Sequence, residues 1–248
     1  MFYVSALGLT QDPYIDLGPD LLWFNVGRQQ LHVPFSGERA DVLRGTIVLR
    51  YANLASLEER LERVRDHFTG TPFGFAREDD AVHVTGPWGN RFRCIDGAAG
   101  TLMSSGLASV EFAVPHGTAP SIARFYSEAM GAPSCQSDGR CDVVVGARQT
   151  FAFVESDDVP DYDGHHVAIY VSNFSGPHSF LAERNLIAEE TNEFQYRFNW
   201  IVDPDSGEEV FELEHEVRSL YHPLADRPLI TKNPDQRLQG YVVGDDAR

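Results

Sequence analysis

The sequence predicts an α+β fold made of two tandem copies of one module, and two observations carry this prediction. Phe2-Tyr3 matches Phe125-Tyr126 at an offset of 123 residues, and GTIVLRYANL from Gly45 matches HHVAIYVSNF from His165 at an offset of 120. Similar stretches that recur in one order at nearly one spacing indicate an internal repeat. Between them, apolar residues follow helical spacing in some segments and strand patterns in others, so each copy should divide into two βαβββ halves.

The individual elements follow from local patterns. Residues 54–68 place Leu57, Leu61, Val64 and Phe68 on one helical face, and a second helix carries Ile122, Phe125 and Ala129. A further helix begins near Phe180. Six stretches alternate or run apolar, as strands do: LLWFNV, TIVLRY, DVVVG, QTFAFVE, HVAIYV and EVFELE. Gly-Asn, Asp-Gly and Ser-Gly pairs between later strands predict antiparallel hairpins.

The first copy begins differently from the second. In the second copy, the strand SVEFAV at residues 109–114 precedes the helix that holds Phe125 and Tyr126. The counterpart of that strand in the first copy would lie before Met1. We therefore expect the first module to lack its opening strand, either because Met1 is an internal start of a longer chain or because this copy never had the strand.

Charge and hydropathy exclude several classes of function. The 248 residues contain 37 Asp and Glu against 20 Lys and Arg, which gives a formal net charge of -17. Such a chain should not bind nucleic acid or an anionic membrane surface. No run of 18 apolar residues and no cleavable leader is present, so neither a membrane span nor a secretion signal is predicted, and the expected location is cytoplasmic.

The motifs together resemble the vicinal oxygen chelate superfamily, which includes glyoxalase I, extradiol dioxygenases and the fosfomycin and bleomycin resistance proteins. The resemblance rests on the FY and Gly at each helix end, the HVAIYV strand, and the Asp-Pro turn at Asp203 that leads into VFEL. It spans residues 1–217 and implies modules that curl into partly open barrels of mixed sheet. The implied domains are residues 1–100, with its ligands lost, and residues 106–217, with a metal site, followed by a tail at 218–248.

In that superfamily, side chains on the first and last strands of a half hold a divalent metal. Carried over to this chain, the resemblance implies Glu111, His166 and Glu212 as ligands of Fe, Mn, Ni or Zn. One imidazole and two carboxylates suit any of these ions and leave positions for a small substrate that binds through two oxygens. The first copy has Thr46 and Arg93 at two of the corresponding positions.

His32 offers a second ligand set. Some members of the superfamily assemble a site from halves of different copies, and His32 occupies a fourth ligand position in the first copy. It could therefore join His166 and Glu212 as a set of two histidines and one carboxylate. The alternative is a histidine that lines the barrel without binding an ion.

The resemblance implies an enzyme of lyase or isomerase type, in which Glu111 or Glu212 takes a proton from carbon. Tyr196, Arg197 and Trp200 precede the ligand-bearing strand and are expected either to contact the substrate or to pack as ordinary strand residues. Ring cleavage by an extradiol dioxygenase is a weaker alternative, because Trp200 stands where that group has a tyrosine and Asn192 to Phe194 supply no histidine.

A third possibility is a small-molecule binding protein that uses no metal, as in some resistance proteins. Aromatic residues make up 11% of the chain, including Trp23, Trp88 and Trp200, which could line such a groove. Members of the superfamily commonly pair, so a homodimer is also expected.

Overall fold

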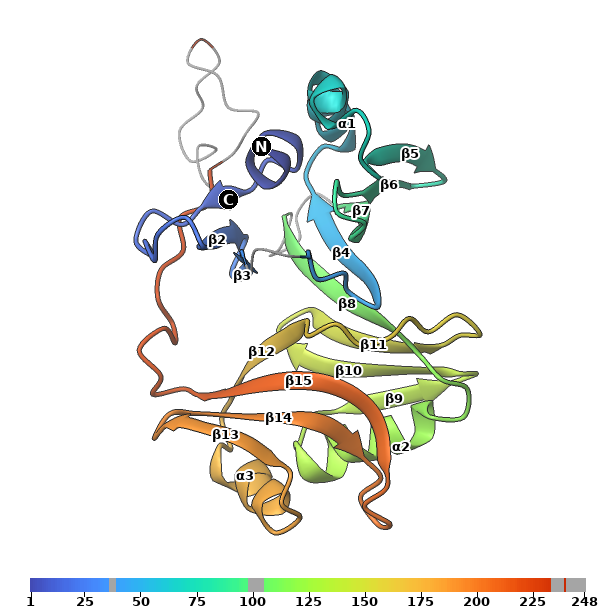
Figure 1. The fold of residues 1–248 in the computed structure, drawn as a ribbon, viewed down its shortest axis with the longest axis vertical. Helices are drawn as coiled ribbons and strands as arrows, with labels where there is room; N and C mark the ends of the chain where they lie inside the picture. Colours follow the sequence, from blue (N-terminus) through green and yellow to red (C-terminus); the bar gives the residue numbers. More distant parts are fainter. Residues whose placement is uncertain (36–38, 98–104, 233–238, 240–248) are drawn as a thin grey trace. The chain divides into compact units, whose positions relative to one another are not determined.

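A computed structural model of the protein describes residues 1–35, 39–97, 105–232 and 239. The chain divides into two compact units (Figure 1). Unit 1 comprises Met1–Val42, Thr46–Ser109 and Pro228–Arg248, and unit 2 comprises Leu43–Gly45 and Val110–Arg227. Of the predicted tail at 218–248, residues 218–227 fall in unit 2 and residues 228–232 fall in unit 1.

The first half of unit 1 contains a short helix and three strands. The π-helix η1 spans Phe2–Ala6. The strands that follow are β1 at Thr10–Gln11, β2 at Leu21–Val26 and β3 at Gln29–Pro34. They form an antiparallel sheet in the order β1-β2-β3. η1 begins at the second residue of the chain.

The second half of unit 1 has the complete predicted order of strand, helix and three strands. Its elements are β4 at Gly45–Tyr51, α1 at Leu54–Val64 with the 3-10 turn η2 at Arg65–Phe68, β5 at Gly74–Glu78, β6 at Ala81–Thr85 and β7 at Arg91–Asp96. β4 pairs in parallel with β7, and β5, β6 and β7 pair as antiparallel hairpins. Because Leu57 and Leu61 are fully buried, the predicted apolar face of α1 is confirmed.

Unit 2 repeats this arrangement twice. The first half of unit 2 contains β8 at Gly106–Val114, α2 at Ala119–Arg124, the π-helix η3 at Phe125–Ala129, β9 at Ser134–Ser137, β10 at Arg140–Gly146 and β11 at Gln149–Glu155. The second half of unit 2 contains β12 at His166–Val171, α3 at Ser175–Ala182, β13 at Ile187–Asn192, β14 at Gln195–Val202 and β15 at Glu209–Ser219. The strand orders are β8-β11-β10-β9 and β12-β15-β14-β13.

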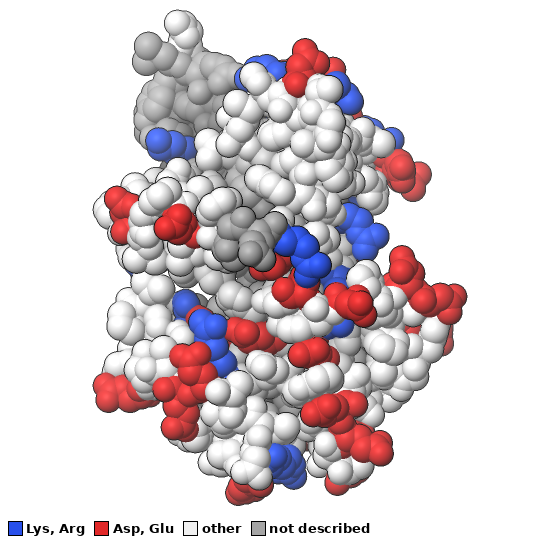
Figure 2. Space-filling model, in the orientation of Figure 1, with Lys and Arg blue, Asp and Glu red and all other residues white. Residues whose placement is uncertain are grey.

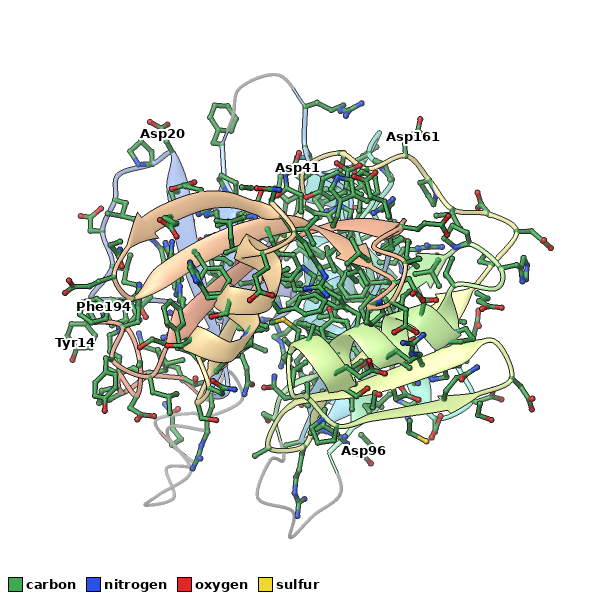
Figure 3. All side chains as sticks on the ribbon, turned by 90° about the horizontal axis from the view of Figure 1, so that it is seen from below. Tyr14, Asp20, Asp41, Asp96, Asp161 and Phe194 are labelled. Carbon is green, nitrogen blue, oxygen red and sulfur yellow. The ribbon has the colours of Figure 1, made fainter. Side chains whose placement is uncertain are left out.

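The helices of unit 2 cover one face of its strands. In Figure 3, which views the molecule from below, α2 and α3 lie in front of the sheets of this unit. Phe125 packs against Phe198, and Tyr126 packs against Phe153, so both strand sets contribute to one core. The residues of β14 and β15 that point away from the helices are therefore the ones available for a site.

The internal repeat is confirmed at the level of hydrogen bonds. Both FY segments form π-helices, and the amides of Leu9 and Ala132 donate to the carbonyls of Tyr3 and Tyr126 at 2.9 and 2.8 Å. Each helix ends at a glycine in the left-handed region, Gly8 with φ 72 and Gly131 with φ 67. Glycine is favoured there because a Cβ atom would be strained, so the two copies share one cap geometry.

The surface agrees with the acidic composition. Figure 2 shows Asp and Glu side chains spread over the face that it displays. No helix among the described residues is long and apolar enough to cross a membrane.

Candidate functional site

Strand β15 separates an apolar face from an acidic one. Its residues Phe211, Leu213 and His215 are buried, and His215 stacks on Phe198 at 4.4 Å on the helix side. Side chains alternate along a strand, so Glu212, Glu214 and Glu216 share the opposite face. We call these three glutamates the acidic row.

Two arginines neutralise most of the acidic row. Arg197 on β14 donates through Nη1 to Glu214 Oε1 at 2.7 Å, and through Nη2 to Glu216. Arg218, further along β15, forms an ion pair with the same Glu216 carboxylate. Glu216 is only 2% exposed, and such a buried carboxylate requires paired cations to remain charged.

Polar neighbours hold Arg218 in place. Its Nε donates to Gln195 Oε1 at 3.1 Å, and its Nη1 donates to the hydroxyl of Tyr170 at 2.9 Å. Gln195 and Arg218 are opposite one another in the β14–β15 register, and Tyr170 lies on the neighbouring strand β12. Three strands therefore fix the arginines that balance the acidic row.

Glu212 differs from the other two members of the row. Within the described part of the chain, its carboxylate makes no hydrogen bond and no ion pair, although the charge of Arg44 lies nearby. Trp200 is directly opposite Glu212 in the β14–β15 register. Because residues opposite one another point to the same face of a sheet, Trp200 lies on the face of Glu212, and it is half-buried whereas Phe198 is fully buried. Glu212 is thus a half-buried carboxylate beside an indole ring.

Side chains of unit 2 form hydrogen bonds with the backbone around Glu212. The Arg44 guanidinium donates to the carbonyl of Glu212 and lies 4.2 Å from the centroid of the Phe211 ring. Burial lowers the pKa of Arg44, and the nearby Glu212 charge opposes that shift. The amide of Glu214 donates to the Tyr162 hydroxyl at 3.2 Å, while burial raises the pKa of Tyr162 to about 12.

His166 begins β12 and is opposite Glu214 in a parallel pairing. Residues paired in this way point to the same face, so His166 belongs on the side of the acidic row. Its neighbour His165 is 8% exposed and is hydrogen bonded through Nδ1 to Asp163 Oδ1 at 2.7 Å. The structure thus places His166 and Glu212 on one face of adjacent strands, offset by two residues.

Glu111 lies on β8, in the other sheet of unit 2. Its carboxylate faces Arg140 on β10, with 3.4 Å between Oε1 and Nη2. Arg140 also pairs with Asp142 at 2.8 Å. Glu111 is therefore engaged by a cation, unlike Glu212.

The three residues expected to contact substrate lie on both faces of β14. Arg197 and Trp200 are on the face of the acidic row. Tyr196 is 1% exposed and packs against Phe174 and His178 on the side of α3, at centroid distances of 5.0 and 5.1 Å. Tyr196 therefore packs as an ordinary strand residue, which was the alternative to a substrate contact.

His32 belongs to unit 1. It lies on β3, opposite Trp23 in the β2–β3 register, with 4.8 Å between the two ring centroids. Its role as a ligand stays a prediction.

Comparisons with known proteins give structural likeness only. No family model matches the chain, and no curated protein matches it. Solved structures do match. A protein of Bacillus subtilis subsp. subtilis strain 168 named as a putative dioxygenase aligns with a TM-score of 0.55 at 15% identity, over 88% of this chain and 79% of that one.

Two other alignments cover most of the chain. The CppA protein of Streptococcus pneumoniae TIGR4 aligns with a TM-score of 0.47 at 12% identity, over 88% of this chain and 90% of that chain. The 2,2',3-trihydroxybiphenyl 1,2-dioxygenase of Sphingomonas wittichii RW1 aligns with a TM-score of 0.42 at 13% identity, over 78% and 74%.

The chain has the vicinal oxygen chelate fold. Fold likeness at this identity does not fix the chemistry, which depends on the residues of the site. The resemblance seen in the sequence motifs implies a divalent metal, so the donor set of unit 2 must be tested against one. Among the described residues, no three His, Cys, Asp or Glu side chains form a group that could hold an ion. With Glu111 held by Arg140, the donors as they stand do not complete a vicinal oxygen chelate metal site.

Several residues of the site were not predicted from the sequence. Glu214 and Glu216 form a partly buried network with Arg197 and Arg218. The alternation in ELEHEVRS could have indicated this, because a strand with buried Leu213, His215 and Val217 must place its charges together. Nothing in the sequence indicated Arg44, which lies 168 residues from its partner Glu212.

Proposed function

We propose that the protein is an enzyme that binds a small oxygen-rich molecule on the face of unit 2 that carries the acidic row, and that Glu212 accepts a proton from it. One observation carries this proposal. Of the three glutamates in the row, only Glu212 has a carboxylate without a hydrogen bond or ion pair among the described residues.

The neighbours of Glu212 suit such a role. A carboxylate that accepts protons must keep an available oxygen within reach of the substrate. Glu214 and Glu216 cannot easily do so, because Arg197 and Arg218 stabilise their charged forms. The indole of Trp200 offers an apolar surface beside Glu212, and Arg197 offers donors for substrate oxygens.

The corresponding reaction is proton transfer at a carbon next to an oxygen-bearing carbon, as in lyase and isomerase chemistry. The substrate class we propose is small 2-hydroxycarbonyl and 1,2-dicarbonyl compounds. Glu212 would remove the proton from carbon, and the Arg44 contact would hold the Glu212 backbone in place during the step.

Fluorescence of Trp200 gives a direct binding test. Dihydroxyacetone, lactaldehyde, methylglyoxal and catechol would each be titrated into the wild-type protein and into Trp200→Phe. A saturable change that is present in the wild type and absent in Trp200→Phe supports the site. A change that persists in Trp200→Phe places binding elsewhere, near Trp23 or Trp88.

A divalent ion site is the second candidate, and it is favoured by the shared face of His166 and Glu212. Glu111 would have to leave Arg140 to complete the set. An ion bound there would supply Lewis-acid polarisation of substrate oxygens. Elemental analysis after incubation with Fe, Mn, Ni or Zn tests it. Stoichiometric metal that is lost in His166→Ala and retained in His178→Ala supports the site, and equal metal in both variants contradicts it.

The same titrations separate the remaining alternatives. Binding of a compound without any conversion favours a binding protein over an enzyme. Oxygen consumption with catechol favours ring cleavage over proton transfer. A homodimer and a cytoplasmic location stay predictions, and sedimentation of the purified chain tests the first.

A further inference from the structure

A small cavity lies within unit 1. It is bounded by the end of η1, the turn between β2 and β3, the end of β4 and residues Thr231 and Lys232. Its volume is about 50 Å³, which is room for a few atoms beyond a single water. Leu9, Val26 and Leu49 give it an apolar part.

The charged residues in the described lining of this cavity are all positive. Arg50, Arg60 and Lys232 line it, and no Asp or Glu is among its described lining residues. This is unusual in a chain whose net charge is -17. Lys232 is also the only lysine of the chain. A cavity with cations and no carboxylate favours an anion, because opposite charge stabilises buried ions.

Arg60 brings its charge into the interior of unit 1. It lies on α1 with an exposed fraction of 6%, beside the buried face of Leu57 and Leu61. Burial raises the pKa of the Cys94 thiol to about 12, and the positive charge of Arg60 acts in the opposite direction. The guanidinium therefore lies close enough to affect a fully buried residue.

Residues 230–232 close the cavity through three hydrogen bonds. Asn25 Nδ2 donates to the Ile230 carbonyl at 2.8 Å, Thr231 Oγ1 donates to the Gly27 carbonyl at 3.1 Å, and the Lys232 amide donates to Thr10 Oγ1 at 2.8 Å. Asn25 is fully buried, so its bond to the tail is part of the folded unit.

The turn at Gly27 is also built for close approach. Gly27 has φ 63, and a Cβ atom there would lie 2.8 Å from the Ser105 carbonyl oxygen. Both features require glycine. The wall of the cavity is thus fixed by backbone geometry as well as by hydrogen bonds.

We propose that this cavity binds a small organic carboxylate, with Arg60 as the main cation and the short apolar body of the ligand against Leu9, Val26 and Leu49. The proposal is independent of the function proposed for unit 2, because no residue is shared between the two sites. Lys232 would add a second positive charge from the tail, so binding would also strengthen the attachment of residues 230–232.

The single lysine allows a selective test on the full chain. Reductive methylation with carbon-13 labels only Lys232 and the amino group of Met1, and dimethylation keeps the positive charge of lysine. Sodium propionate is then titrated while the two methyl signals are followed by NMR. The expected result is a saturable shift of the Lys232 signal that propionamide, a neutral compound of the same shape, does not produce.

Substitution of Arg60 provides a second test of the proposal. Arg60→Gln should weaken propionate binding at least about tenfold, the loss expected from one charge-assisted hydrogen bond. Arg63→Gln is the matched control, because Arg63 lies on the same helix and is exposed. If Arg60→Gln does not fold, Arg60→Lys replaces it and should bind more weakly than the wild type.

Three outcomes would overturn the proposal: no saturable shift at millimolar propionate, an equal shift with propionamide, or equal affinity in the Arg60 variant and the wild type.

Discussion

The final strands of the two units carry opposite charges in the same pattern. In β7 of unit 1, Arg91 and Arg93 alternate with buried Phe92. In β15 of unit 2, Glu212 and Glu214 alternate with buried Leu213. The buried positions carry an apolar residue in both strands, because the core requires one. On the other face, the side chains are positively charged in β7 and negatively charged in β15. The comparison teaches that the fold restricts only one face of these strands and leaves the other to function.

The pairing of these strands also differs between the units. In unit 1, Thr46 is opposite Arg91, two residues before Arg93. In unit 2, His166 is opposite Glu214, two residues after Glu212. An even change in register keeps each side chain on its face. Thr46 and His166 therefore occupy equivalent strands and faces, and so do Arg93 and Glu212. The spacing between the two matched residues along the paired strands, however, differs between the units.

The largest effect is expected where unit 2 buries its charges. Glu216→Ala would leave Arg197 and Arg218 without the carboxylate that pairs both. Breaking a buried ion pair in this way should lower the free energy of unfolding by about 3 to 5 kcal/mol. Urea unfolding measures it. Glu209→Ala on the exposed end of the same strand is the control, and equal stability of the two variants would show that the network contributes little.

The next effect depends on pH and on a core histidine that unit 1 lacks at the matching strand. Burial lowers the pKa of His215 to about 4 from 6.5, and Tyr126 lies 2.5 Å from its Nε2. The folded state therefore holds His215 neutral, while the unfolded state binds a proton below pH 6.5. Stability from this group is complete above pH 6.5 and falls as the pH drops toward 4, by about 3 kcal/mol.

Comparison with His215→Gln isolates this contribution. Unfolding of both proteins would be followed between pH 7 and pH 4, and carboxylates shared by both cancel in the difference. The wild type should lose more stability than the variant over this range. Parallel curves would mean that His215 does not titrate as its buried position requires.

A smaller effect should be equal in the two units. Gly8 and Gly131 end equivalent π-helices with left-handed φ values, so alanine at either position should cost about 1 to 2 kcal/mol. Gly74→Ala is the control, because Gly74 has no positive φ and its Cβ would meet nothing within 4 Å. Thermal unfolding measures all three. Unequal costs at Gly8 and Gly131 would break the equivalence of the two caps.

Much of the fold could be predicted from the sequence because it depends on local patterns. LLWFNV matches β2 residue for residue, and the Asp-Gly and Ser-Gly turns lie between the strands they were expected to join. The repeated FY and Gly positions predicted two equivalent helices. These features follow from alternation, helical spacing and the freedom of glycine, all of which are visible in one segment at a time.

The candidate site could be predicted only in part, because it depends on partners that are distant in sequence. The family resemblance of the motif around Asp203 and of the HVAIYV strand implied Glu212 and His166, but it did not indicate which carboxylates are neutralised. That depends on Arg197, Arg218 and Arg140, whose partners are set by strand register. Tyr196 shows the same limit, since one position along a strand decides between the core and the site.

The central claim is that Glu212 is the available carboxylate of unit 2, and solvent exchange tests it most directly. The compound that binds in the Trp200 titrations would be incubated in deuterium oxide with the wild type, Glu212→Gln or Glu214→Gln, and loss of its carbon-bound proton signal would be followed by NMR. We expect Glu212→Gln to slow exchange by about 10²- to 10⁴-fold and Glu214→Gln to keep the rate within about tenfold of the wild type. Exchange at the wild-type rate in Glu212→Gln, or an equal loss in both variants, would contradict the account.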